Sequence, residues 1–167
     1  MSEADLLVDS FGRVREIVHE VLHGLSAKQL SYRPDGRGNS IGWLVWHLTR
    51  VQDDHVADAA GKAQVWTEQG WADRFDLPFD RAATGYGHSG ADVDAVRISS
   101  PDLLGGYHDA VHAATIDFLH GLTADDYATV VDDAWDPPVT LAIRLVSVVS
   151  DDLQHAGQAA YVRGLLP

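Results

Sequence analysis

The chain has 167 residues, which suits one domain with a single sizeable core. Its 25 acidic and 12 basic side chains give a net charge of −13. This charge opposes binding to nucleic acid or anionic membranes, because both depend on Lys and Arg. The absence of cysteine excludes disulfides, cysteine-based zinc sites and a cysteine nucleophile. The N-terminus lacks the basic start and apolar run of a secretion signal, so we expect one cytoplasmic domain spanning 1–167.

The first half of the chain predicts two helices. Apolar residues recur at three- and four-residue intervals over 3–25, which is typical of an amphipathic helix. A polar stretch with one proline and two glycines then breaks the pattern. A second helix is expected from Asn39 or Ser40, either of which can cap it, to about Ala60.

The segment 61–99 is a long connection for a compact domain. It is too rich in aromatic residues to be a free linker, so we expect it to pack over the rest of the protein. A short helix is expected around Thr67–Phe75. Trp66 and Trp71 are candidates for the walls of a pocket that binds a cofactor or substrate.

The second half of the chain predicts two further helices. A capping Ser100 followed by Pro101 begins a third helix that continues to about Leu119. A fourth is expected from about Val139 to Arg163, and its nearly all-round apolar surface predicts that it is the most buried helix. No segment shows convincing strand alternation. The sequence therefore predicts an all-α four-helix bundle with a long connection between the second and third helices.

The last helix carries the most informative polar pair. Asp151 and His155 are four residues apart, which places a carboxylate and an imidazole on one face, about 6 Å apart along the axis. This spacing allows both side chains to bind one metal ion. The alternative is structural, because Arg144 shares the same face and can form an ion pair with Asp151.

Two histidines of the second helix are possible third donors. On a helical wheel His55 faces the centre of the apolar stripe and His47 lies at its edge, so geometry alone favours His55 as the more buried residue. A single inward histidine is more often a hydrogen-bonded core residue than a ligand. The residue pattern therefore leaves open whether either histidine meets the pair on the last helix.

Two motifs resemble the DinB-like superfamily of four-helix-bundle metal proteins. One is Asn39-Ser40-Ile41-Gly42-Trp43-Leu44-Val45-Trp46-His47-Leu48, which is similar to the superfamily's second-helix signature. The other is Asp151-Asp152-Leu153-Gln154-His155-Ala156-Gly157-Gln158, which is similar to its last-helix pattern. The resemblance covers nearly the whole chain in helix order and is closest to an uncharacterised branch of actinobacterial type.

The resemblance implies one divalent metal ion held by His47, Asp151 and His155. Many members have histidine where this chain has Asp151, whereas thiol-dependent relatives such as mycothiol-dependent maleylpyruvate isomerase have an acidic residue there. Two imidazoles and one carboxylate suit zinc, nickel, manganese or iron. The resemblance also implies a low-molecular-weight thiol, such as mycothiol, as a cosubstrate.

The sequence therefore suggests a metal-dependent enzyme that activates a thiol for S-transfer to, or isomerisation of, a small electrophile. His55 is a candidate base or hydrogen-bond partner, and Arg144 a candidate contact for an anionic substrate. A hydrolase that uses metal-activated water is the second enzymatic alternative. A non-catalytic metal-binding or interaction protein, with a homodimer formed through bundle faces, is the alternative from another class.

Overall fold

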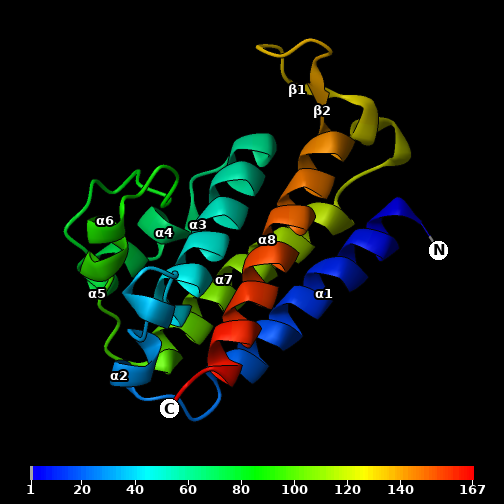
Figure 1. The fold of residues 1–167 in the computed structure, drawn as a ribbon. Coiled ribbons are helices and arrows are strands. Elements are labelled where there is room, and N and C mark those ends of the chain that lie inside the picture. Colours follow the sequence, from blue (N-terminus) through cyan, green and yellow to red (C-terminus); the bar gives the residue numbers. More distant parts are fainter. Residues whose placement is uncertain (1) are drawn as a thin grey trace.

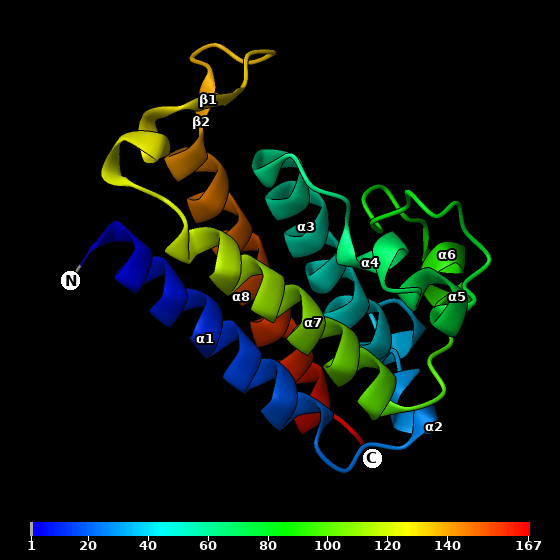
Figure 2. The same cartoon turned by 180° about the vertical axis from the view of Figure 1, so that it is seen from behind.

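The computed structural model describes residues 2–167 and confirms the all-α four-helix bundle (Figure 1). The four long helices are α1 (Glu3–Leu22), α3 (Ile41–Ala60), α7 (Pro101–His120) and α8 (Leu141–Gly164). Both α1 and α3 pack against α7 and α8. Helices α1 and α8 run in one direction, and α3 and α7 in the other (Figures 1 and 2). Because the neighbours α3 and α7 are parallel, the chain between them must return along the bundle.

Each long helix begins at a hydroxyl side chain that accepts a hydrogen bond from a backbone N–H of the first turn. These residues are Ser2, Ser40, Ser100 and Thr140. At the start of α1 the Asp5 carboxylate also accepts from the backbone N–H of Ser2, which completes a capping box. The predicted helix starts are therefore confirmed to within two residues.

Short elements fill the connections. Before α3 lie α2 (Ala27–Leu30) and the 3₁₀ helix η1 (Pro34–Gly36). The long connection contains α4 (Val65–Glu68), α5 (Trp71–Phe75) and α6 (Gly90–Ala95), which lie on the α3 side of the bundle (Figure 1). Of these, α4 contacts α3, and α5 contacts α4 and α7. The helix predicted around Thr67–Phe75 is thus two helices, because Gly70 between them has a φ of 72°.

A small hairpin precedes α8 and was not predicted. After the 3₁₀ helix η2 (Ala124–Ala128), strands β1 (Val130–Asp132) and β2 (Val139–Thr140) pair antiparallel and project beyond the end of α8 (Figure 1). Two strands of three and two residues carry too little side-chain alternation to be recognised in a sequence.

The prediction that the last helix is the most buried is wrong, because α3 takes that place. Helix α8 packs against α1 and α3, but its outer face leaves Ile143, Val146 and Tyr161 exposed at 49%, 62% and 69%. Helix α3 contacts α7 and α8 and is also covered by the connection, so buried residues occur around its circumference. Apolar residues on α8 are therefore not all buried, although the sequence pattern suggests that they are.

A buried arginine joins α3 to the connection. Arg50 is 0% exposed, and its guanidinium donates to the carbonyls of Ala83 and Arg81 and to the side-chain oxygen of Gln64. Its charge lies 3.7 Å from the Asp53 carboxylate, one turn further along the helix. Burying such a charge is costly unless its donors are satisfied, so these contacts fix the connection against α3.

Asp53 holds the other end of the same segment. Its two carboxylate oxygens accept from the backbone N–H groups of Val65 and Trp66, at the start of α4. The Tyr107 hydroxyl on α7 also donates to it, at 2.8 Å. Burial raises the pKa of Asp53, while these hydrogen bonds and Arg50 oppose the rise. The network thus ties α3, α4 and α7 together.

The bundle interior also contains a neutral histidine. The hydroxyl of Thr49 donates to the carbonyl of Val45 and so accepts from Nδ1–H of His108, at 3.1 Å. The Nε2 atom of His108 is buried and has no hydrogen-bond partner. Burial, together with the nearby His112, lowers the pKa of His108 to about 3.

We predict that His108 makes the fold sensitive to mild acid. Between about pH 6.5 and 3 the unfolded chain protonates this ring and the folded chain does not, so stability falls as the pH falls. The free energy of unfolding of wild type should drop by about 2 kcal/mol more than that of His108→Gln between pH 7 and 5. Urea unfolding at both pH values measures this, with the exposed His23→Gln as control. Parallel losses in wild type and His108→Gln would contradict it.

Candidate metal centre

Three side chains from two helices converge between α3 and α8. His47 lies in the second turn of α3, and Asp151 and His155 lie on successive turns of α8. One ligand atom from each lies within 4.8 Å of the others. The two imidazole centroids are 4.8 Å apart, and Oδ1 of Asp151 is 3.6 Å from Nε2 of His155. His47 is about a hundred residues from the other two in the sequence, and it meets them because α3 and α8 pack side by side.

Hydrogen bonds fix the tautomers of both histidines. Nδ1 of His47 lies 2.6 Å from the carbonyl oxygen of Thr84, which can only accept, so this nitrogen carries the proton. Nδ1 of His155 lies 3.1 Å from the side-chain oxygen of Gln158 and donates in the same way. Both Nε2 atoms therefore keep a free lone pair, as metal-binding histidines require.

A loop of the long connection shapes the site around His47. Gly85 follows the Thr84 acceptor and has a φ of 95°, and a Cβ on it would lie 2.7 Å from Nδ1 of His47. The Trp43 indole also stacks on the His47 ring, with centroids 4.6 Å apart. The Trp43 indole N–H in turn donates to Nδ1 of His88. The imidazole is thus held both by the loop at Thr84 and Gly85 and by Trp43.

Burial and mutual charge set the ionisation of the three residues. His47 is 6% exposed, and burial lowers its pKa, which favours the neutral form that a metal ion needs. The contact with His155 lowers the pKa of Asp151, and the same contact raises the pKa of His155. The neutral imidazole of His47, beside the carboxylate of Asp151 and the imidazole of His155, is compatible with a cation bound between the three side chains.

The donor set fits a divalent metal ion. Oδ2 of Asp151 is buried and has no hydrogen-bond partner among the described residues, although carboxylate oxygens in such positions are normally satisfied. Two imidazole nitrogens and one carboxylate oxygen suit zinc, nickel, manganese or ferrous iron. Three protein ligands also leave positions open for a small molecule.

A cavity of about 450 Å³ opens beside the three donors. Its walls include His47 and Asp151, together with the predicted residues His55 and Arg144 and the exposed ring of Tyr86. Arg144 donates to Nδ1 of His55, at 3.0 Å. The structure therefore brings five of the residues singled out in the sequence to one place: the three donors and this pair.

Two expectations about these residues are corrected by the structure. Arg144 forms its ion pair with Asp132 of β1, at 2.9 Å, and not with Asp151. The unpredicted hairpin supplies this partner. His47 is buried and His55 only partly so, the reverse of the wheel interpretation. A wheel assumes one buried face, whereas the loop at Thr84 covers the other side of α3.

Trp66 and Trp71 lie elsewhere. Trp66 is buried against Trp46 and Tyr107, and its indole N–H donates to the carbonyl of Arg81. Trp71 is half-buried against Tyr107. Neither lines the cavity beside His47. The connection instead contributes Thr84 and Gly85, which sequence reasoning missed because a carbonyl acceptor leaves no signature.

Comparisons with known proteins agree with this architecture. A family model described as mycothiol-S-transferase matches residues 6–167. The chain belongs to the mycothiol-S-transferase family. The fold is also similar to the crystal structure of a conserved protein from Enterococcus faecalis, with a TM-score of 0.91 and 28% sequence identity. That match covers 98% of this chain and 96% of the other. No curated protein is significantly similar to the chain.

Membership of the mycothiol-S-transferase family confirms the DinB-like resemblance and supports the transferase class. None of the described helices combines the length and the hydrophobicity that a membrane span requires.

We predict that Gly85→Ala weakens metal binding by about ten- to a hundredfold, because the added methyl group displaces the His47 ring from its Thr84 acceptor. Titration with zinc against a chromophoric chelator measures the affinity. Gly87→Ala is the matched control, since Gly87 also has a positive φ, 75°, but its Cβ would meet no atom within 4 Å. Equal affinities for the two variants would show that Gly85 does not position His47.

Proposed function

We propose that this protein is a divalent-metal-dependent transferase that activates mycothiol, or a similar low-molecular-weight thiol, for reaction with a small electrophile. The observation that supports this most is the convergence of His47, Asp151 and His155 beside a cavity that His47 and Asp151 line, in a member of the mycothiol-S-transferase family. The thiol gives up its proton to solvent, and its sulfur bonds to an electrophilic carbon. It either displaces a leaving group such as chloride or adds to a double bond, whose other carbon then takes up a proton. The product is a thioether, or an isomer when the carbon–sulfur bond breaks again and the thiol is released.

His47, Asp151 and His155 would hold the metal ion through Nε2, carboxylate oxygen and Nε2. A bound divalent cation would favour the thiolate form of a coordinated thiol at neutral pH. Two acceptors orient the imidazoles by holding Nδ1–H of each ring: the carbonyl of Thr84 for His47 and the side-chain oxygen of Gln158 for His155. The chain itself has no cysteine, so the nucleophilic sulfur must come from the cosubstrate.

His55 is suited to donate a hydrogen bond rather than to act as a base. The Arg144 guanidinium has only donors, so Nδ1 of His55 accepts and its Nε2 carries the proton. Burial lowers the pKa of His55, and Arg144 adds to this effect, so the ring is neutral near pH 7. We infer that Nε2–H of His55 and the unused donors of Arg144 stabilise negative charge that develops on the electrophile.

We predict that the purified protein binds one divalent ion per chain and that His47→Ala and Asp151→Asn each abolish stoichiometric binding. Among the described residues the candidate ligands are three, and the substitutions remove one imidazole ligand and the negative charge of the carboxylate ligand, respectively. Elemental analysis after reconstitution with zinc, nickel, manganese or ferrous iron measures this.

The control for metal binding is His23→Ala, which removes an exposed histidine outside the site and should bind like wild type. Absence of any stoichiometric metal in wild type under all four conditions would overturn the proposed metal centre. Unchanged stoichiometry in both ligand variants would place the metal elsewhere.

We predict that the metal-loaded protein accelerates the reaction of mycothiol with an electrophilic fluorophore such as monochlorobimane, and that chelation abolishes this activity. His55→Phe should lower the rate about tenfold or more while leaving metal stoichiometry unchanged, because it removes one hydrogen bond to developing charge. Fluorescence of the thioether product follows the reaction. Thiol-independent hydrolysis of an ester, with no thioether formed from mycothiol or bacillithiol, would instead support the hydrolase alternative.

A further inference from the structure

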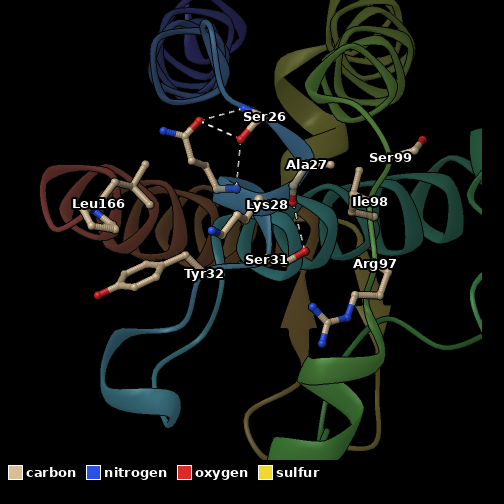
Figure 3. Close-up of a pocket in the computed structure, with 11 residues that line it drawn as sticks. Ser26, Ala27, Lys28, Ser31, Tyr32, Arg97, Ile98, Ser99 and Leu166 are labelled. Atoms are coloured by element: carbon tan, nitrogen blue, oxygen red, sulfur yellow. Dashed lines mark hydrogen bonds between the residues drawn. The ribbon is translucent and has the colours of Figure 1, made fainter.

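A second cavity, larger than the one beside His47, lies next to α2 and the last residues of the chain. It has a volume of about 960 Å³ and lies between α2, the segment 97–99 and the last two residues, Leu166 and Pro167 (Figure 3). It shares no lining residue with the cavity beside His47. We refer to it as the α2 groove.

The α2 groove collects positive charge in a strongly acidic protein. Lys28 from α2 and Arg97 from the opposite segment both line it, and no Asp or Glu side chain does so. The terminal carboxylate of Pro167 is the one negative group in the described lining, and it forms no ion pair with either cation. Within residues 2–167 neither cation takes part in an ion pair or a side-chain hydrogen bond. In a chain with 25 acidic and 12 basic residues, two unpaired cations that face one cavity favour an anionic ligand.

Some polar groups of the α2 groove form hydrogen bonds within the protein, and others have no partner among the described residues. Ser26 and Gln29 bond to each other in a capping box, and the Ser31 hydroxyl donates to the carbonyl of Ala27 (Figure 3). These contacts hold α2 in a fixed shape. The hydroxyls of Tyr32 and Ser99, by contrast, have no hydrogen-bond partner among the described residues.

Apolar surface lies beside these donors. Ile98 is buried next to Arg97, while the Tyr32 ring and Leu166 lie on the other side of α2 (Figure 3). The Arg97 guanidinium and the Ser31 side chain lie toward each other across the groove (Figure 3). A ligand of this site would therefore place an anionic group between the cations and an apolar body against the walls.

We propose that the α2 groove binds a small organic anion, with its carboxylate, phosphate or sulfonate group held by Lys28 and Arg97 and its aromatic or aliphatic body packed against Tyr32, Ile98 and Leu166. This site is separate from the metal centre and does not depend on the proposed function. The binding energy comes from charge-assisted hydrogen bonds on one side and apolar contact on the other.

The test uses the aromatic sulfonate 8-anilinonaphthalene-1-sulfonate, whose fluorescence rises in apolar surroundings. Wild type should show one saturable site, and the double variant Lys28→Gln/Arg97→Gln should bind the dye about tenfold more weakly or worse, because two charged donors are lost. Ser99→Tyr, which fills the groove without changing the charge, should also weaken binding. Zinc loading should leave the affinity unchanged, since the metal centre is elsewhere.

The matched control is Arg37→Gln/Lys62→Gln, which removes two exposed cations outside the α2 groove. It should bind the dye like wild type. Equal weakening in the control and the groove variant would overturn the proposal by showing a general charge effect, and so would the absence of saturable binding in wild type. Competition with phenyl phosphate and with phenylacetate identifies the preferred anionic group, and failure of both to displace the dye also overturns the proposal.

Discussion

The buried guanidinium of Arg50 is the contact on which the geometry of the candidate metal centre depends. This positively charged group is fully buried, and it donates hydrogen bonds to the carbonyl groups of Ala83 and Arg81. Satisfying this charge fixes the segment that ends in Thr84 and Gly85, directly against His47. The hydrogen bonds that satisfy the buried charge of Arg50 therefore also position the loop that orients the His47 imidazole at the cavity wall.

This arrangement explains why the connection between α3 and α7 is long. Two parallel neighbouring helices require a returning segment, and here that segment also covers the back of α3 and supplies the acceptor for His47. Helices α3 and α8 carry the three candidate metal ligands, whereas the loop at Thr84 and the β1–β2 hairpin supply the residues that contact the side chains around them. Through Asp132 the hairpin holds Arg144, and Arg144 in turn fixes the tautomer of His55.

The sequence predicts the helices well because their ends carry local signals, such as Ser40 and the Ser100-Pro101 pair. It also singles out Asp151 and His155 as candidate ligands, because their four-residue spacing can be recognised in the sequence alone. It does not rank His47 above His55, because burial of His47 depends on a loop nearly forty residues away in the chain. The partner of Arg144 is missed for the same reason. Trp66 shows the converse limit, since aromatic residues in a connection are equally consistent with core packing and with a pocket wall.

X-ray absorption spectroscopy of the zinc-loaded protein, before and after addition of mycothiol, tests whether His47, Asp151 and His155 hold a metal ion that binds a thiol. We predict two imidazole nitrogens and a carboxylate oxygen around the ion, and a new sulfur neighbour at about 2.3 Å once the thiol is added. A first shell without imidazole would contradict the assignment of His47 and His155. A shell that includes both imidazoles but gains no sulfur at saturating mycothiol would retain the metal centre and contradict its role in activating a thiol.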